Sequence, residues 1–176
     1  ALEQAMKVGK QILLLAQKQA DVDDPTAKDL YDVGTVATIL QLLKLPEEAY
    51  AMMGDYLEFS LKEAAQRAFA TVHLAGMWAK IMKAALAIPQ THVRHGALEV
   101  ADGASLLANL GATGELLVKI EASNTAREMY DHLEAAGRQD LIQAVCRKAR
   151  EYCQGVTGGT VHIYLVNHKA DLIAHD

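Results

Sequence analysis

Apolar positions recur at helical spacing along much of this chain, and short β-branched runs interrupt them. Over residues 1–20 the apolar side chains lie three or four positions apart, which predicts a helix. An acidic stretch over 21–25 then ends at a proline, and the residue before a proline avoids helical geometry. We therefore expect a helix followed by an acidic linker over residues 1–25. The next stretch is ambiguous, with a short strand over 30–33 and a helix over 35–43 as the preferred reading.

Two consecutive segments in the middle of the chain each combine an apolar run, a glycine and a helical pattern. In the first segment the apolar run is 49–53, the glycine is Gly54 and the helical pattern is 56–68. In the second segment the apolar run is 71–75, the glycine is Gly76 and the helical pattern is 78–87. Glycine allows the chain to reverse tightly after a strand. This alternation is typical of parallel strands joined by crossover helices.

The rest of the chain is helical until a β-branched run near its end. Residues 97–153 show helical spacing, and Thr125 followed by Glu128 forms a capping-box pattern that opens one of the helices. Residues 160–166 and 171–174 read as two strands joined by a turn. We predict an α/β fold with a small, mostly parallel sheet, flanking helices, a helix-rich middle and a C-terminal strand pair.

Composition narrows the class of protein. The chain has 176 residues, of which 51% are hydrophobic and 22% charged, enough apolar material for a single α/β domain over residues 1–176. A formal net charge of −5 argues against a polycation for nucleic acid, so we expect no nucleic-acid partner. No apolar run approaches the ~20 residues that cross a bilayer, so we expect no membrane association. Two cysteines are too few for a disulfide framework, which favours a cytoplasmic location.

Candidate chemistry lies where the two predicted strands end. Ligands of open α/β sheets bind beyond the carboxyl ends of the strands, and here those ends carry Gly54-Asp55 and Gly76. A glycine lets a ligand approach the backbone, and the following helix offers free N–H groups to an anion. Plain turn glycines are the alternative, because neither GxGxxG nor a Walker loop is present.

Cationic and titratable groups gather after the second of these strands. Lys80 and Lys83 share a helix face, and the loop after Pro89 carries Thr91, His92 and Arg94. Together these groups suit a ligand with several carboxylates. A solvated helix face followed by an ordinary loop explains the same composition.

Metal binding has little support in the sequence. His92 and His95 lie three residues apart but lack a third ligand, because Cys146 and Cys153 belong to a different helix. We therefore predict no metal site. His73, which falls in a strand run, reads as a partly buried and satisfied histidine rather than as a base.

Several motifs in order resemble one known family, the cobalt-precorrin-5B C1-methyltransferases or CbiD-type enzymes. Residues 45–59 resemble its "LPEEAFxxMGDFxGF" segment, and residues 72–83 resemble its "GxxGKLxKxA" strand-to-helix motif. Thr91-His92 stands where the family has "TH", residues 122–126 resemble its "ANTA" segment, and residues 161–173 are similar to its closing strand pair. The resemblance thus covers a core over residues 44–174.

This resemblance implies an S-adenosylmethionine-dependent methyl transfer to C1 of a cobalt-precorrin, a step of cobalamin biosynthesis. It assigns Gly54, Asp55 and Gly76 to the cofactor. The usual pKa of an imidazole and the loop position of His92 suggest a catalytic role for it, in which the imidazole adjusts protonation. The resemblance assigns substrate binding to residues on three segments: Lys80, Lys83, Thr91, Arg94, Asn124 and Thr125. Family members are longer, which implies a C-terminal portion and a missing N-terminal half as the completing partner. A homo-oligomer is the other possibility for the assembly.

Departures from the family pattern keep other readings open. Ala79 replaces a family glycine, Glu58 replaces a small residue, and the family's "TTGGR(S/T)E" segment has no counterpart in residues 33–41. These changes suit a non-catalytic ligand-binding or assembly module on the same scaffold. A helix-rich interaction module over residues 96–153 would need no pocket at all.

Overall fold

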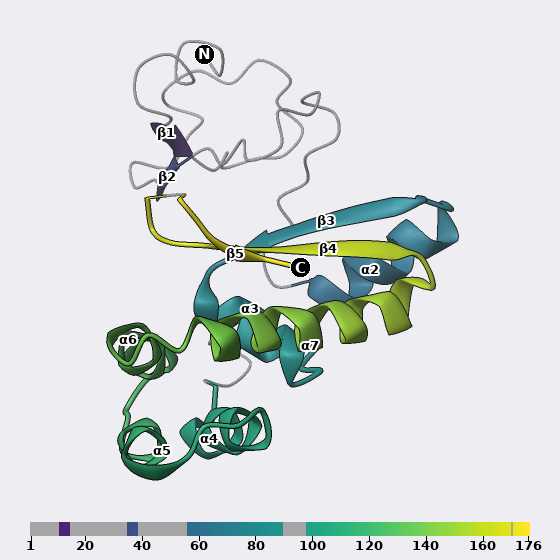
Figure 1. Ribbon diagram of the computed structural model, residues 1–176. Coiled ribbons are helices and arrows are strands. Elements are labelled where there is room, and N and C mark those ends of the chain that lie inside the picture. Colours follow the sequence, from purple (N-terminus) through teal and green to yellow (C-terminus); the bar gives the residue numbers. More distant parts are fainter. Residues whose placement is uncertain (1–10, 15–34, 39–55, 90–97, 170) are drawn as a thin grey trace. The chain divides into compact units, whose positions relative to one another are not determined.

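The computed structural model describes residues 11–14, 35–38, 56–89, 98–169 and 171–176 (Figure 1). It divides the chain into two compact units, Ala1–Glu47 and Glu48–Asp176, and each is described here by itself. The sequence leads us to expect one domain over residues 1–176. The boundary between the units falls close to the start of the core expected over 44–174.

The described part of the first unit is a pair of short strands. Strand β1, Gln11–Leu14, pairs antiparallel with β2, Thr35–Thr38, so that Gln11 lies opposite Thr38. At these residues the spacing predicts helices over 1–20 and 35–43, and the structure has strands instead. Spacing alone does not distinguish helix from strand in apolar runs this short, and β2 is rich in β-branched residues that favour an extended chain.

The second unit contains a three-stranded mixed sheet in the order β3-β4-β5. Strand β3, Thr71–Gly76, runs parallel to β4, Thr160–Val166, and Thr71 lies opposite Thr160. Strand β5, Leu172–His175, runs antiparallel to β4. These strands confirm the predicted α/β class and its C-terminal strand pair. The strand predicted over 49–53 lies outside the described residues.

The turn between β4 and β5 is held by one asparagine side chain. The Oδ1 atom of Asn167 accepts hydrogen bonds from the backbone N–H of Lys169 at 2.8 Å and of Asp171 at 2.9 Å. The backbone N–H of Asn167 donates to the Asp171 carbonyl at 3.1 Å, which closes the turn. A side chain that replaces backbone partners in this way is typical of an Asx turn.

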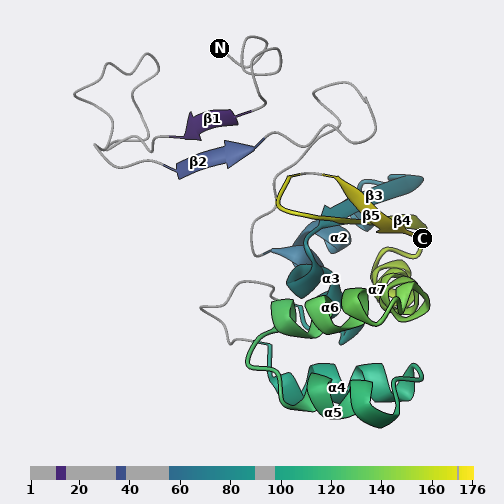
Figure 2. The ribbon, with the colours of Figure 1, turned by 60° about the vertical axis from the view of Figure 1, so that its left-hand side comes forward.

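The described helices all lie to one side of the sheet (Figures 1 and 2). Helix α3, Trp78–Ala85, and the long helix α7, Gln139–Thr157, cover this inner face, and α2, Leu57–Gln66, packs beside α7. The strands present alternate residues to the helices, and these inner side chains are buried: Leu74, Val161, Ile163 and Leu165. The opposite face of the sheet is called the outer face below.

Three further helices form the predicted helix-rich middle: α4, Val100–Asn109; α5, Gly114–Glu121; and α6, Ala126–Ala135. Helix α6 contacts α3 and α7, and α4 and α5 pack together below it in Figure 2. The closest approach is at Gly103 of α4, where an added Cβ would lie 3.1 Å from the sulfur atoms of both Met129 and Met82. Helix α7 ends at Gly158 with φ of 66°, a left-handed conformation that glycine adopts without strain.

Candidate functional site

The turn from β3 to α3 forms the carboxyl edge at which the sequence predicts a ligand. Strand β3 ends at Gly76, Met77 is extended, and the backbone N–H groups of Lys80 and Ile81 donate to the Met77 carbonyl at 2.9 and 3.1 Å. A Cβ at Gly76 would lie 3.1 Å from Ile81 Cδ1. Close packing of α3 on the strand is therefore one reason for glycine at this position.

The start of α6 is built by a reciprocal cap. Thr125 is the N-cap residue, and its hydroxyl accepts a hydrogen bond from the Glu128 backbone N–H at 3.2 Å. The Glu128 carboxylate in turn accepts from the backbone N–H of Asn124 at 2.7 Å. This geometry confirms the predicted capping pattern and gives Thr125 a structural role, because its hydroxyl satisfies an N–H group that the helix leaves unpaired. Asn124 takes part through its own backbone N–H, which Glu128 satisfies.

A ring contact joins helices α3 and α6. The Trp78 and Tyr130 rings lie with centroids 5.5 Å apart and tilted by 55°. Trp78 is the first residue of α3, and Tyr130 lies five residues after the α6 N-cap, about 7.5 Å along the helix. The contact therefore joins the start of α3 to the middle of α6 rather than to its N-cap.

Polar and charged groups lie beside the Trp78–Tyr130 contact. The Tyr130 hydroxyl donates to Glu134 at 3.2 Å, and burial together with this carboxylate raises the pKa of Tyr130. The guanidinium of Arg127 lies 5.8 Å from the centre of the Tyr130 ring. The Trp78 indole N–H is buried and meets no acceptor within the described residues. Tyr130 is therefore neutral at physiological pH.

The two predicted substrate lysines differ in environment. Lys83 is only 4% exposed, whereas Lys80 is partly exposed. Both lysines have interaction partners within the chain. Lys83 therefore does not lie on the solvated face that its spacing with Lys80 suggests, and Lys80 is the better placed of the two to meet a ligand from solvent.

Five predicted site residues, Gly54, Asp55, Thr91, His92 and Arg94, lie outside the described residues. The described ones fall on the β3–α3 turn (Gly76, Lys80), inside α3 (Lys83) and at the start of α6 (Asn124, Thr125). A shared site for these residues stays a prediction.

A second group of side chains lies on the outer face and was not predicted as a site. His73 of β3 and His162 of β4 are opposite each other in the parallel register, and their rings stack with centroids 5.2 Å apart and planes 19° apart. The Nδ1 atom of His73 lies 3.1 Å from the Tyr164 hydroxyl. His73 is exposed rather than partly buried, contrary to the sequence reading. The available signal was a repeated Thr-Val-His at residues 71–73 and 160–162.

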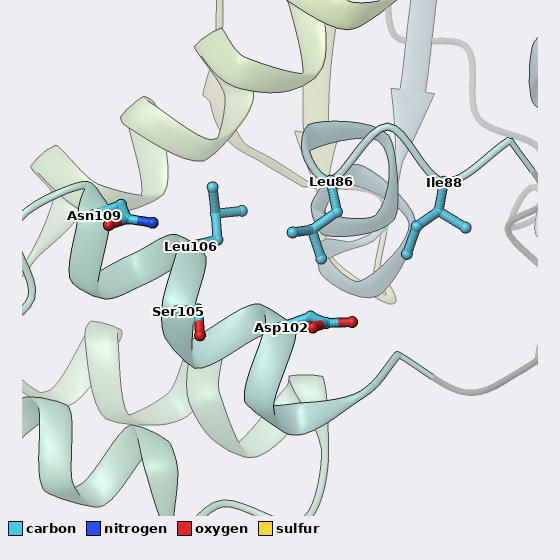
Figure 3. A pocket seen from close by; sticks show the side chains of 6 residues that line it. All are labelled: Leu86, Ile88, Asp102, Ser105, Leu106 and Asn109. Carbon is cyan, nitrogen blue, oxygen red and sulfur yellow. The ribbon is translucent and has the colours of Figure 1, made fainter.

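A shallow pocket of about 380 Å³ lies at the other end of α3 (Figure 3). Leu86 and Leu106 face each other across it, and Asp102 lies below Leu86 in this view. Helix α3 has eight residues and is about 12 Å long, so this pocket is remote from the carboxyl edge. Its volume is at the lower limit of small-molecule sites.

The described residues hold neither a cluster of metal-binding side chains nor a helix that could span a membrane. The part of the chain that the structure describes contains no cluster of three or more His, Cys, Asp or Glu side chains able to hold a metal ion. Within that same part, every helix is too short or too polar to cross a membrane.

Comparison with known proteins divides the chain in two. The family model described as CbiD, C-terminal domain matches residues 90–176, and the model of the ATP-dependent protease La (LON) substrate-binding domain matches residues 1–84. No solved structure matches the chain. The two matched ranges do not overlap, so the two ends of the chain resemble different proteins.

Individual relatives show the same division. A cobalt-precorrin-5B C(1)-methyltransferase from Desulfotalea psychrophila is 62% identical over 136 residues, which are 77% of this chain and 38% of that protein. The enzyme of the same name from Priestia megaterium is 31% identical over 113 residues, 64% of this chain and 30% of that protein. A Lon protease from Vibrio parahaemolyticus is 72% identical over 46 residues, 26% of this chain and 6% of Lon.

The chain therefore spans well under half the length of the methyltransferases it matches. The ordered motifs over 45–173, the α/β fold with its C-terminal strand pair and the family-model match agree with one another. Through residues 90–176, this chain belongs to the CbiD family.

Proposed function

We propose that the second unit is the C-terminal portion of an S-adenosylmethionine-dependent methyltransferase that acts on C1 of a cobalt-precorrin in cobalamin biosynthesis. The observation that carries this proposal is the 62% identity over 136 residues to the Desulfotalea psychrophila enzyme. Sequence similarity at this level over most of the chain favours a shared substrate class over a shared fold alone.

The described residues suit such a reaction because they can position reactants. When bound, S-adenosylmethionine supplies an activated methyl group, whose bond to sulfur breaks as a bond to the nucleophilic ring carbon forms. Alignment of the two reactants supplies much of the rate in such a transfer, so the protein's task is orientation. Rigid elements on both sides of the Trp78–Tyr130 contact are suited to that task.

The hydrogen-bond donors at the carboxyl edge of β3 suit S-adenosylmethionine, the methyl donor. The Lys80 N–H of the first turn of α3 already donates to the Met77 carbonyl, but the N–H groups of Trp78 and Ala79 precede the first helical hydrogen bond and suit the carboxylate of an amino acid. We assign Gly54, Asp55 and Gly76 to this cofactor. We assign the carboxylate arms of the substrate to Lys80, Thr91, Arg94, Asn124 and Thr125, and proton adjustment to His92. Lys83 is buried, so we do not assign it to the substrate.

A graft experiment tests this function. The 136 matched residues of the Desulfotalea psychrophila enzyme are replaced by those of this chain, and methyl transfer from S-adenosylmethionine to the cobalt-precorrin is measured. We expect the graft to retain activity within about tenfold of the parent enzyme, and a Lys80→Ala graft to raise KM for the substrate. A folded graft without any transfer would contradict the proposal and favour the ligand-binding or assembly module.

A further inference from the structure

The outer face of the β3–β4 pair carries a concentrated group of imidazoles. Alternate residues of the two strands point away from the helices: Thr71, His73, Ala75, Thr160, His162 and Tyr164. All of them except Tyr164 are exposed, and Tyr164 is half-buried. The described helices lie on the other side of the sheet (Figures 1 and 2). Apart from the three rings, this surface consists of small side chains.

The position of His73 is fixed from two sides. Its ring stacks on His162 at 5.2 Å, and its Nδ1 atom lies 3.1 Å from the Tyr164 hydroxyl. In the arrangement where Nδ1–H donates to the Tyr164 oxygen, Nε2 carries the free lone pair of a neutral imidazole. A metal-binding histidine typically donates its other ring N–H to such a partner, which orients the ring.

We propose that this outer face receives the cobalt macrocycle of the substrate, with His73 Nε2 as an axial ligand of its cobalt. The identity of the ligand rests on the proposed function. The step is a ligand exchange without redox change: the Nε2 lone pair forms a bond to cobalt, and an axial water leaves.

The chemistry of the macrocycle explains why one imidazole is sufficient. The ring itself supplies four nitrogen ligands to cobalt, so the protein need offer only an axial donor rather than a cluster of three side chains. Imidazole suits transition metals of the first row. The lowered pKa of His73, caused by burial and by His162, favours the neutral imidazole that can bind a metal.

The small side chains of this face also leave room for a planar ring. Ala75, Thr71 and Thr160 lie around the imidazole pair and raise little obstacle to a flat ligand. From His73 to Gly76 the strand advances three residues, about 10 Å, so a ring centred over His73 extends towards the carboxyl edge of β3. This arrangement would bring the substrate rim close to the edge where the methyl donor is proposed.

Absorption spectroscopy tests the proposal on the whole chain. A diaqua cobalt(III) corrinoid with free carboxylates is titrated with the protein, and exchange of axial water for imidazole shifts its visible bands. After reduction to cobalt(II), electron paramagnetic resonance shows a triplet splitting from one axial nitrogen. We expect both signals with the unchanged chain, and we expect His73→Gln to abolish them and weaken binding at least tenfold.

Matched variants separate this site from unspecific coordination. His168→Gln removes an exposed histidine of the β4–β5 turn and should leave the spectrum unchanged. Tyr164→Phe should keep the axial signal but weaken binding, because the ring loses its orienting partner. Trp78 fluorescence checks that each variant is folded.

Three results would overturn the proposal. If the corrinoid binds without any axial shift, the axial role is wrong while the proposed function stands. If the shift persists in His73→Gln, another group is the ligand. If the corrinoid does not bind at all, this face is no corrinoid site, and the graft experiment decides separately whether the methyltransferase function holds.

Discussion

Gly103 provides the sharpest test of how the helix-rich middle packs on α3 and α6. In an exposed helix, replacing glycine by alanine gains up to about 1 kcal/mol because the unfolded chain loses backbone freedom. At Gly103 the new methyl would lie 3.1 Å from the sulfur atoms of Met129 and Met82, where ordinary contact begins near 3.4 Å. Both methionines are fully buried, so neither can move out into solvent.

Overpacking of a core by one methyl group costs about 1–3 kcal/mol, which exceeds the gain in helix propensity. We therefore expect Gly103→Ala to lower the free energy of unfolding by about 1 kcal/mol. Gly155→Ala is the matched control, because Gly155 also lies in a helix and nothing lies within 4 Å of its added Cβ. That control should raise the free energy of unfolding by about 0.5–1 kcal/mol.

Urea unfolding followed by tryptophan fluorescence measures both variants. The chain has one tryptophan, Trp78, which is 5% exposed and belongs to the second unit, so its signal reports this unit alone. Equal stabilisation by Gly103→Ala and Gly155→Ala would refute the reasoning, because it would show that α4 does not approach α3 and α6 as closely as described.

Three further predictions concern other parts of the second unit. Thr125→Ala should lower the free energy of unfolding by about 1 kcal/mol because the α6 cap is lost, whereas Thr125→Ser should keep most of the stability that the cap provides. Equal loss of stability in both variants, measured by urea unfolding, would contradict the role of the cap. Burial raises the pKa of the Cys146 and Cys153 thiols to about 12, so an alkylating reagent at pH 8 should modify neither thiol until denaturant is added. Mass spectrometry measures the labelling. Rapid labelling of the native protein would contradict this prediction, because it would show that the thiols are accessible. The pKa of His73 is lowered from 6.5 by burial and by the facing His162, and the Tyr164 hydroxyl lies against it; the neutral ring is therefore favoured in the folded state, and its contribution to stability is present above pH 6.5 and is lost as pH falls towards the folded pKa. Proton NMR titration measures the pKa of His73, and comparison with His73→Gln identifies its signal. A pKa of His73 above 6.5 would contradict the prediction.

Local patterns predicted the elements of the second unit well. The β-branched run over 160–166 is strand β4 with those same bounds, and the glycine after 71–75 is the last residue of β3. These segments carry their own signals, because alternating burial, turn residues and caps act over a few positions. Residues 11–14 differ, since their strand depends on pairing with 35–38, which helical spacing cannot show.

The candidate site was only partly visible in the sequence. Thr125 was recognisable both as a cap and as part of a family motif, and the structure describes the first role. The burial of Lys83 was not predictable, because three-residue spacing places two lysines on one face without telling what covers that face. The His73–His162 pair needs the parallel register of two strands that lie 89 positions apart in the sequence (162 against 73).

The similarity of residues 1–84 to Lon is consistent with the lack of one methyltransferase motif there. Residues 33–41 lack the family's "TTGGR(S/T)E" segment, and the 46-residue match to Lon shows that a different class of protein is the better comparison for part of this chain. The motifs resembling the methyltransferases begin at residue 45, next to the boundary of the second unit at Glu48. We therefore place the proposed site for the methyltransferase ligands within the second unit.

Calorimetric titration of this chain is the most direct test of that claim. The two ligands are a cobalt corrinoid with free carboxylates and S-adenosylhomocysteine, the product form of the methyl donor. We predict binding of the corrinoid at micromolar affinity with one site per chain, weakened at least tenfold by Lys80→Ala and unchanged by Lys148→Ala on the exposed surface of α7. Absence of heat with both ligands would contradict the account, because it would show that these residues do not form the ligand site.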